Sequence, residues 1–257
     1  MDILVWIMAG TLLPWFPLSW IFNKLLASAP GFWAQALAIL VFPQLGLLLL
    51  IYSGAWQALP VGLDSNLRVV ALFTAVFYAF RAASTREVQV WARLMTTSGL
   101  ALTWLLHGQN LDPLTLQSFA LAWSIPGALM LVWAGLLKQR MGGAYLGLRG
   151  GLATVLPRLS ALITLTALAA SATPIFPNFF ILLHVVKALP LVWIPGGLLV
   201  LLLWGWAVGR FLQDLLFGIY RGELLEDLTV GGTWLGGLVL GLFAVGGIFW
   251  GGAWIMN

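Results

Sequence analysis

The chain has 257 residues, of which 61% are hydrophobic and 8% are charged, and its mean hydropathy is +1.01. A soluble domain carries about 25% charged residues and cannot cover this much apolar surface, so soluble, disordered and nucleic-acid-binding classes are excluded. The formal charge of +4 comes from scattered residues without a basic run, and the absence of cysteine excludes disulfides and thiolate chemistry. The lipid bilayer is therefore the expected surrounding of the chain.

The apolar stretches predict an all-α polytopic integral membrane protein with about eight transmembrane helices, because a spanning helix needs roughly 20 mostly apolar residues. The third stretch is short, and the sixth is interrupted near Pro174 and Pro177. A cleavable leader is not expected, since Asp2 replaces a basic start and the first stretch contains Pro14 and Pro17. In chain order, the expected spans lie near 3–26, 32–58, 67–80, 88–106, 114–137, 159–184, 191–211 and 230–255.

The loop charges agree with this number of spans. All but Arg68 and Lys187 of the 12 Lys and Arg residues fall in odd-numbered loops. Because cytoplasmic loops are enriched in Lys and Arg, the odd loops are expected in the cytoplasm and both termini outside, in a bacterial inner membrane. The residues in odd loops are Lys24, Arg81, Arg86, Arg93, Lys138, Arg140, Arg149, Arg158, Arg210 and Arg221.

Tryptophan and glycine are both abundant. The terminal segment 229–257 is rich in glycine, and Gly232 with Gly236, like Gly237 with Gly241, has the small-xxx-small spacing that permits close helix approach. Of the 15 tryptophans, several fall near expected span ends, where such rings anchor to lipid headgroups. These are Trp15, Trp56, Trp91, Trp104, Trp250 and Trp254.

The sixth span contains the most informative pattern, Thr173, Pro174, Pro177 and Asn178 after a long apolar run. Each proline removes a backbone donor and disturbs the preceding turn, so the pattern predicts a discontinuous helix. Broken helices in transporters often mark ion or substrate sites, but a simple proline kink packed by neighbours fits the pattern equally well.

Two basic side chains follow the break. His184 and Lys187 are three residues apart and share one helix face, so they are candidates for a proton or ion pathway. The alternative is that Lys187 lies near the outer helix end and extends to the headgroups. His107 ends the fourth span and is expected at the interface, although it could belong to a displaced relay.

These features resemble the antiporter-like, proton-conducting membrane subunits of respiratory complex I, Mrp cation/proton antiporters and related complexes. The resemblance covers about 67–218. It rests first on residues 150–158, where a helix starts with Gly-Gly-Leu and contains a proline, and on the broken helix that ends in a turn of small residues and proline before Phe179. Upstream, it rests on a charged turn in 86–93, a Ser/Thr-rich helix start in 96–99 and the helix 118–137.

The chain also departs from this family. Family members usually have around fourteen helices in two inverted repeats, and only something like the C-terminal half is recognisable here. Trp123 falls where a histidine is common, Gly127 where a lysine is common, and Leu182 near the usual lysine or glutamate after the break. Glu87 lies near the usual turn lysine, so a charge of opposite sign is a further pathway candidate.

The resemblance implies a subunit of a larger complex that couples proton or sodium movement to electron transfer or to inorganic-carbon accumulation. Its partners would be a larger antiporter-like membrane subunit and a cytoplasmic subunit, as in complexes of the DAB type with a carbonic-anhydrase-like partner. The loop from Arg210 to Thr229 is a candidate docking surface or simply a solvated loop. No catalytic residue, cofactor or metal site is expected from two histidines and no cysteine.

Two alternatives remain open. The missing family residues favour a non-conducting scaffold subunit, whereas a small stand-alone transporter is disfavoured because no internal repeat is evident. The expected organisation is a single transmembrane domain over 1–257, with two extra helices in 1–60, the antiporter-like region in 67–218 and a Gly-rich helix in 229–257.

Overall fold

The computed structural model describes residues 3–57, 61–109, 111–147, 150–220 and 225–255. These residues form helices and no strand, apart from an isolated bridge between Glu87 and Tyr145. The helices are α1 (Ile3–Leu12), α2 (Ser19–Ser28), α3 (Gly31–Tyr52), α4 (Val61–Ser84), α5 (Val88–Ala101), η1 (Leu102–Leu106), α6 (Pro113–Met141), α7 (Leu152–Val155), α8 (Pro157–Ala170), α9 (Pro177–Ala188), η2 (Leu191–Trp193), α10 (Ile194–Leu216) and α11 (Val230–Ile255).

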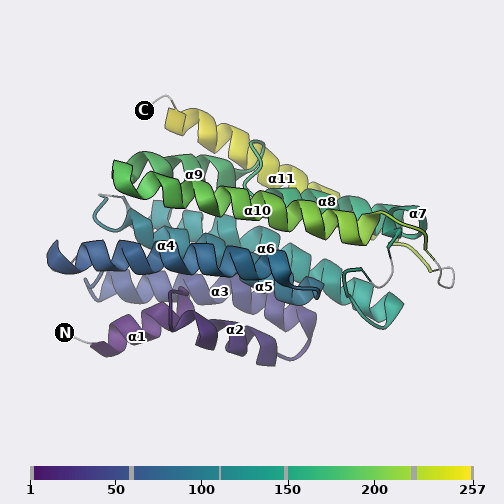
Figure 1. The fold of residues 1–257 in the computed structure, drawn as a ribbon, viewed down its shortest axis with the longest axis horizontal. Helices are drawn as coiled ribbons and strands as arrows, with labels where there is room; N and C mark the ends of the chain where they lie inside the picture. The colour runs from purple at the N-terminus through teal and green to yellow at the C-terminus, as the bar shows by residue number, and fades with distance from the viewer. Residues whose placement is uncertain (1–2, 58–60, 110, 148–149, 221–224, 256–257) are drawn as a thin grey trace.

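The described helices run side by side along the long axis in eight alternating passes, and both chain ends lie at the same end of the bundle (Figure 1). We call this the terminal end, and the end with connections 29–30, 85–87, 142–147 and 225–229 the basic end. Five helices, within α3, α4, α6, α10 and α11, are long and apolar enough to cross a membrane. The fold is therefore that of an all-α polytopic membrane protein.

Three passes are built from shorter pieces, and one of them corrects an expectation. The first expected span is not one helix but α1 followed by α2, because Pro14 and Pro17 interrupt the backbone hydrogen bonds between them. The fourth pass continues from α5 into η1, and the sixth consists of α8 and α9. The third pass, which looked short in the sequence, is the 24-residue helix α4.

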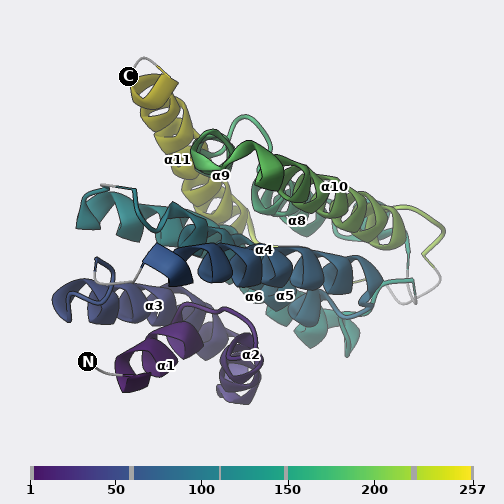
Figure 2. The same ribbon diagram turned by 60° about the vertical axis from the view of Figure 1, so that its left-hand side comes forward.

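The central helix of the bundle is α6, and α11 lies at its edge. In the most apolar 18-residue stretch of each helix, 78% of the residues are buried in α6 and 22% are buried in α11. Figure 2 shows the C-terminal part of α11 diverging from the other helices. Helix α6 starts at Pro113 with its Thr115 amide bonded to the Asp112 carboxylate at 3.0 Å, and ends at left-handed Gly142 (φ 73°). Its ends are thus fixed by its own sequence.

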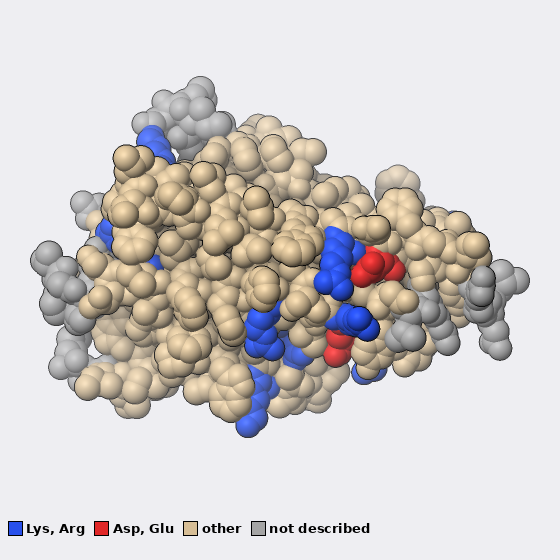
Figure 3. Space-filling view, in the orientation of Figure 1, with Lys and Arg blue, Asp and Glu red and all other residues tan. Residues whose placement is uncertain are grey.

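The basic residues gather at one end of the bundle, as the loop pattern predicts. Arg81 is in the last turn of α4, Lys138 and Arg140 are in the last turn of α6, and Arg158 begins α8. Figure 3 shows a group of Lys and Arg side chains, with two acidic patches among them, from the centre to the right of the face viewed, and a few further basic side chains at its left-hand end. Arg149 and Arg221 lie outside the described residues.

Candidate functional site

The four side chains predicted for an ion pathway lie on different parts of the bundle. Glu87 directly precedes α5 at the basic end, and His107 directly follows η1 at the terminal end. A helical pass of this length places them roughly 30 Å apart. His184 and Lys187 lie on α9, whose last turn approaches the terminal end. Glu87 is therefore far from the other three.

His107 directly follows η1 and His184 lies on α9, and these two elements pack against each other. His107 is 5% exposed, and its ring meets Trp56 edge-on at a centroid distance of 5.2 Å. The half-buried ring of His184 lies 5.9 Å from Phe119 of α6. His107 ends its pass, and aromatic packing encloses its ring there, while its position at the membrane interface stays a prediction.

Lys187 is exposed in the last turn of α9. A cation near a helix C-terminus complements the helix dipole, and a lysine there can extend its ammonium group to the headgroups. This position agrees with the snorkelling alternative. A relay through His184 and Lys187 stays a prediction.

Residues 171–176, which we call the helix break, separate α8 from α9. Ala172 has a φ of 57°, a left-handed conformation that residues with a Cβ rarely adopt. Thr173 compensates for the lost helix by donating to the Leu168 carbonyl through its amide (3.3 Å) and its Oγ1 (2.7 Å). Pro177 then occupies the first turn of α9, where its missing N–H removes no helical bond.

Helix α11 and a buried amide close the helix break. Asn178 is fully buried, and its Nδ2 donates to the Ala169 carbonyl at 3.2 Å, which ties α9 back to α8. Phe176 stacks on Phe243 of α11 at 5.8 Å. A Cβ on Gly247 would lie 2.7 Å from the α9 backbone, so glycine permits this close approach. Such burial is what non-helical backbone requires at membrane depth.

Two tryptophans fill the middle of the bundle between α5, α6 and α10. Trp204 is fully buried, and its Nε1 donates to Ser98 Oγ at 2.9 Å, while its ring lies 5.1 Å from Trp123. Ser98 in turn donates to the Ala75 carbonyl of α4 at 2.7 Å. We call Ser98, Trp123 and Trp204 the tryptophan centre.

Glycines allow the helices to close tightly around the tryptophan centre. A Cβ on Gly99 would lie 2.5 Å from the Trp123 ring, and one on Gly127 would overlap Thr96 Oγ1. Trp123 and Gly127 are the positions at which the resemblance places a histidine and a lysine. Indole bulk and close helix contact therefore occupy the space where those charged or titratable side chains would lie.

The sequence interpretation missed this centre because it treated Trp123 only as a departure from the family pattern and gave Trp204 no role. It also placed buried tryptophans at the interface. Trp56, Trp91 and Trp104 are 6%, 1% and 0% exposed, so their assignment as lipid anchors is wrong. These rings are buried because they pack between passes. Trp91 stacks on the Phe211 ring of α10 at a centroid distance of 4.4 Å, and Trp104 Nε1 donates to the Leu13 carbonyl, just after α1, at 3.2 Å. The side chains of Trp250 and Trp254 lie outside the described residues.

The buried polar groups of the described residues are almost all neutral. Among the buried polar residues of the described structure, His107 is the one histidine, and none of them is Asp, Glu, Lys or Arg. The described residues contain no group of three His, Asp or Glu side chains that could hold a metal ion. The other buried polar residues are Ser19, Thr74, Thr96, Thr97, Ser98, Thr103, Ser124, Ser160, Thr166 and Asn178.

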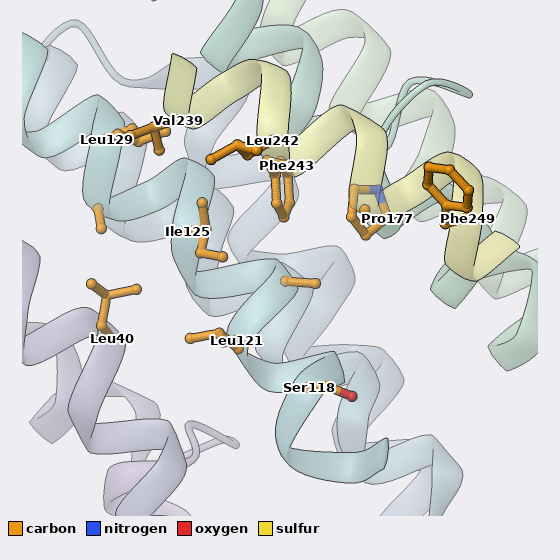
Figure 4. Close-up of a pocket in the computed structure, with 13 residues that line it drawn as sticks. Leu40, Ser118, Leu121, Ile125, Leu129, Pro177, Val239, Leu242, Phe243 and Phe249 are labelled. Carbon is orange, nitrogen blue, oxygen red and sulfur yellow. The ribbon is translucent and has the colours of Figure 1, made fainter. Parts of the chain in front are cut away.

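An apolar groove of about 740 Å³ lies between α3, α6 and α11 (Figure 4). Leu121 and Ile125 of α6 line it together with Leu40 of α3 and Phe243 of α11. Ser118 contributes the one polar side chain of its lining. The groove therefore presents a surface for hydrocarbon and no charge for an ion.

Part of the loop from Arg210 to Thr229 turns inward at the basic end. The Asp227 carboxylate accepts hydrogen bonds from the backbone amides of Arg158 (2.8 Å) and Leu159 (3.2 Å). It thus caps α8, whose own N-cap residue makes no side-chain bond. Residues 221–224 lie outside the described residues, and a docking role for the loop stays a prediction.

Comparison with known proteins shows similarity in structure. No family model and no curated protein matches the sequence. A chain of respiratory complex I from Thermus thermophilus with bound NADH has a TM-score of 0.76 and 20% identity, covering 93% of this chain and 53% of that chain. A chain of the archaeal membrane-bound sulfane sulfur reductase, a respiratory membrane complex, has a TM-score of 0.80 and 18% identity, covering 96% of this chain and 52% of that chain. A chain of the Mrp complex from Dietzia sp. has a TM-score of 0.63 and 14% identity, covering 83% of this chain and 41% of that chain.

The present chain thus spans about half the length of the chains that it matches. At these identities the similarity establishes the fold. The chain has the fold of the antiporter-like membrane subunits of these complexes, over about half of their length.

Proposed function

We propose that the chain is a membrane subunit of a multi-subunit, ion-coupled complex, and that it acts there as a scaffold whose own interior carries no ion. The fold supports the first part, because chains of similar structure belong to complex I, the sulfane sulfur reductase and the Mrp complex. The tryptophan centre supports the second part and is the observation that carries it.

An ion path through a membrane protein needs groups that change charge or coordinate the ion. Charged and titratable side chains are costly in the bilayer and are retained where they serve transport. In the described core of this chain, the central contacts are instead indole rings and hydroxyls that donate to helix carbonyls. These groups stabilise helix packing without a change of charge.

A conducting subunit is the second candidate, and one observation favours it. We interpret α8 and α9 as one discontinuous transmembrane helix, the type of element that forms ion sites in transporters. Asn178 Oδ1 is buried beside the helix break with no hydrogen-bond partner among the described residues. A pathway would then pass from this oxygen to His184, Lys187 and His107, with Glu87 at the opposite end.

Gentle extraction of the tagged chain from its native membrane tests the first part. Mass spectrometry should find a larger antiporter-like subunit and a soluble subunit bound to it. A carbonic-anhydrase-like partner would assign the complex to inorganic-carbon accumulation, and a redox partner would assign it to respiration. Recovery of the folded chain alone would contradict the proposal and favour a stand-alone transporter.

Variants in the assembled complex separate scaffold from conductor. His184→Ala and Lys187→Ala should leave ion-coupled activity unchanged when the complex assembles in normal amount. Loss of coupled activity with normal assembly would contradict the scaffold assignment. Arg86→Ala, an exposed change at the other end of the bundle, is the matched control for a general effect of losing a cation.

A further inference from the structure

Arg93 presents a cation that the described structure does not neutralise by contact. It lies in the second turn of α5 and is half-buried. No hydrogen bond or ion pair of the described residues reaches its guanidinium group, and the charge that acts on it is the carboxylate of Glu87. A partly desolvated guanidinium forms strong hydrogen bonds with an anion, so Arg93 is suited to binding one.

Two more cations lie on the helices that flank Arg93. Helix α5 packs against α4 and α2, and Asn23 Nδ2 of α2 donates to Thr97 Oγ1 of α5 at 3.0 Å, one turn from Arg93. Lys24 follows Asn23, and Arg81 is in the last turn of α4. We call Lys24, Arg81 and Arg93 the basic triad.

The basic triad lies at one depth in the bundle. Its members are three to five residues from the basic-end termini of α2, α4 and α5, which corresponds to roughly 5–8 Å along a helix. The headgroup layer on each side of a bilayer has about this thickness. With the helix ends at the membrane surface, these side chains would lie at the level of the lipid phosphate groups.

Aromatic and apolar side chains extend from the triad toward the middle of the membrane. Lys24 Nζ lies 5.2 Å from the Trp20 ring centroid, and Arg81 Cζ lies 5.8 Å from that of Phe77. Phe80 and Trp20 are 57% and 62% exposed. A ligand at this place would meet cations at its head and hydrocarbon below, which is the chemistry of a phospholipid.

We propose that the basic triad binds the headgroup phosphate of an anionic phospholipid, with the guanidinium of Arg93 as its innermost contact. The carboxylate of Glu87 limits the net positive charge of this site, and that of Asp214 lies 3.7 Å from the neighbouring Arg210. The face retains an excess of positive charge. This inference does not depend on whether the chain conducts ions.

Native mass spectrometry of the full chain, titrated with phosphatidylglycerol or phosphatidylcholine, tests the proposal. Wild type should retain phosphatidylglycerol in preference, and each neutralised triad cation should weaken its binding about fivefold. Phosphatidylcholine binding should not change. Lys138→Gln is the matched control, because Lys138 is exposed at the same end of α6 but outside the triad.

The variants keep the proposal testable if one fails to fold. Arg93→Gln removes the half-buried cation, Arg93→Lys retains the charge, and the exposed double variant Lys24→Gln with Arg81→Gln leaves α5 intact. Equal phosphatidylglycerol binding by wild type and the folded double variant would overturn the proposal. Displacement of the lipid by millimolar inorganic phosphate would show a general anion site instead, and a photo-crosslinker at position 81 that reached a protein subunit would also overturn it.

Discussion

The tryptophan centre and the helix break are closed in different ways. At the centre, three continuous helices meet, and side-chain bulk with hydroxyl-to-carbonyl bonds fills the space. At the break, the backbone itself loses its helical bonds, and Thr173, Asn178 and the close approach of α11 at Gly247 compensate. The difference indicates that this fold can be retained without charged groups in its interior. The packing of the tryptophan centre depends on side-chain volume, whereas that of the helix break depends on hydrogen bonds and backbone contact.

The largest expected effect comes from removing bulk at the centre. Trp204→Ala leaves a cavity and removes the hydrogen bond that Ser98 Oγ accepts, and should lower the free energy of unfolding by about 3 kcal/mol or more. Thermal unfolding in detergent measures this change. Trp206→Ala is the control, because Trp206 on the same helix is 56% exposed and should change little. Equal effects of the two variants would show that the centre is not tightly packed.

The next largest loss of stability is expected from a bulkier side chain at the helix break. Gly247→Val places a side chain against the α9 backbone, which cannot move aside as a flexible side chain can, and should cost about 1–3 kcal/mol. Gly241→Val, on the same helix with open space around it, is the control. A melting temperature unchanged by Gly247→Val would contradict the description of α11 as the cover of the break.

A smaller effect is expected from the side-chain bond that crosses the break. Asn178→Ala removes the Nδ2 bond to the Ala169 carbonyl, and should cost about 1 kcal/mol, the usual value for a bond between membrane helices. It also removes the buried Asn178 Oδ1, which has no hydrogen-bond partner in the described part of the chain, and this lowers the net cost. Chemical unfolding of the wild type and of Asn178→Ala would measure the difference in the free energy of unfolding. A loss as large as that for Trp204→Ala would show that the helix break stabilises the fold as much as the tryptophan centre does.

The smallest effect lies outside both regions, at Asp112. The Thr115 hydroxyl, and then the Thr115 amide, lower the pKa of the Asp112 carboxylate below its ordinary value. A carboxylate with a lowered pKa stabilises the fold above its unfolded-state pKa, and this contribution is lost as the pH falls through the folded-state pKa. Melting temperatures between neutral pH and pH 3 should fall slightly more for wild type than for Asp112→Asn, which keeps a capping side chain. Parallel pH profiles would exclude this contribution.

The sequence predicted the helical passes better than the side-chain contacts between them. Apolar stretches and loop charges indicated eight passes because hydrocarbon thickness imposes a length on each element. The prolines marked the helix break, since proline acts through local backbone geometry. The first pass was predicted as one helix because the apolar run was judged by its length, although Pro14 and Pro17 marked the turn between α1 and α2.

The candidate site was harder to predict because it depends on contacts between distant residues. The pairing of Trp123 with Trp204 joins α6 to α10, and no local pattern encodes it. The position of both residues in the middle of expected spans was the available signal. His184 and Lys187 were found by their charge, but charge alone does not distinguish an exposed helix end from a buried pathway.

Proton flux into liposomes that contain the purified chain shows whether the chain itself carries protons. A pH-sensitive dye would report proton movement under an imposed potassium diffusion potential. If the chain is a scaffold that carries no ion, the flux equals that of empty liposomes at equal lipid composition. Flux above this background in wild type, abolished by His184→Ala or Lys187→Ala in folded protein, would contradict the scaffold assignment and make this chain a conductor.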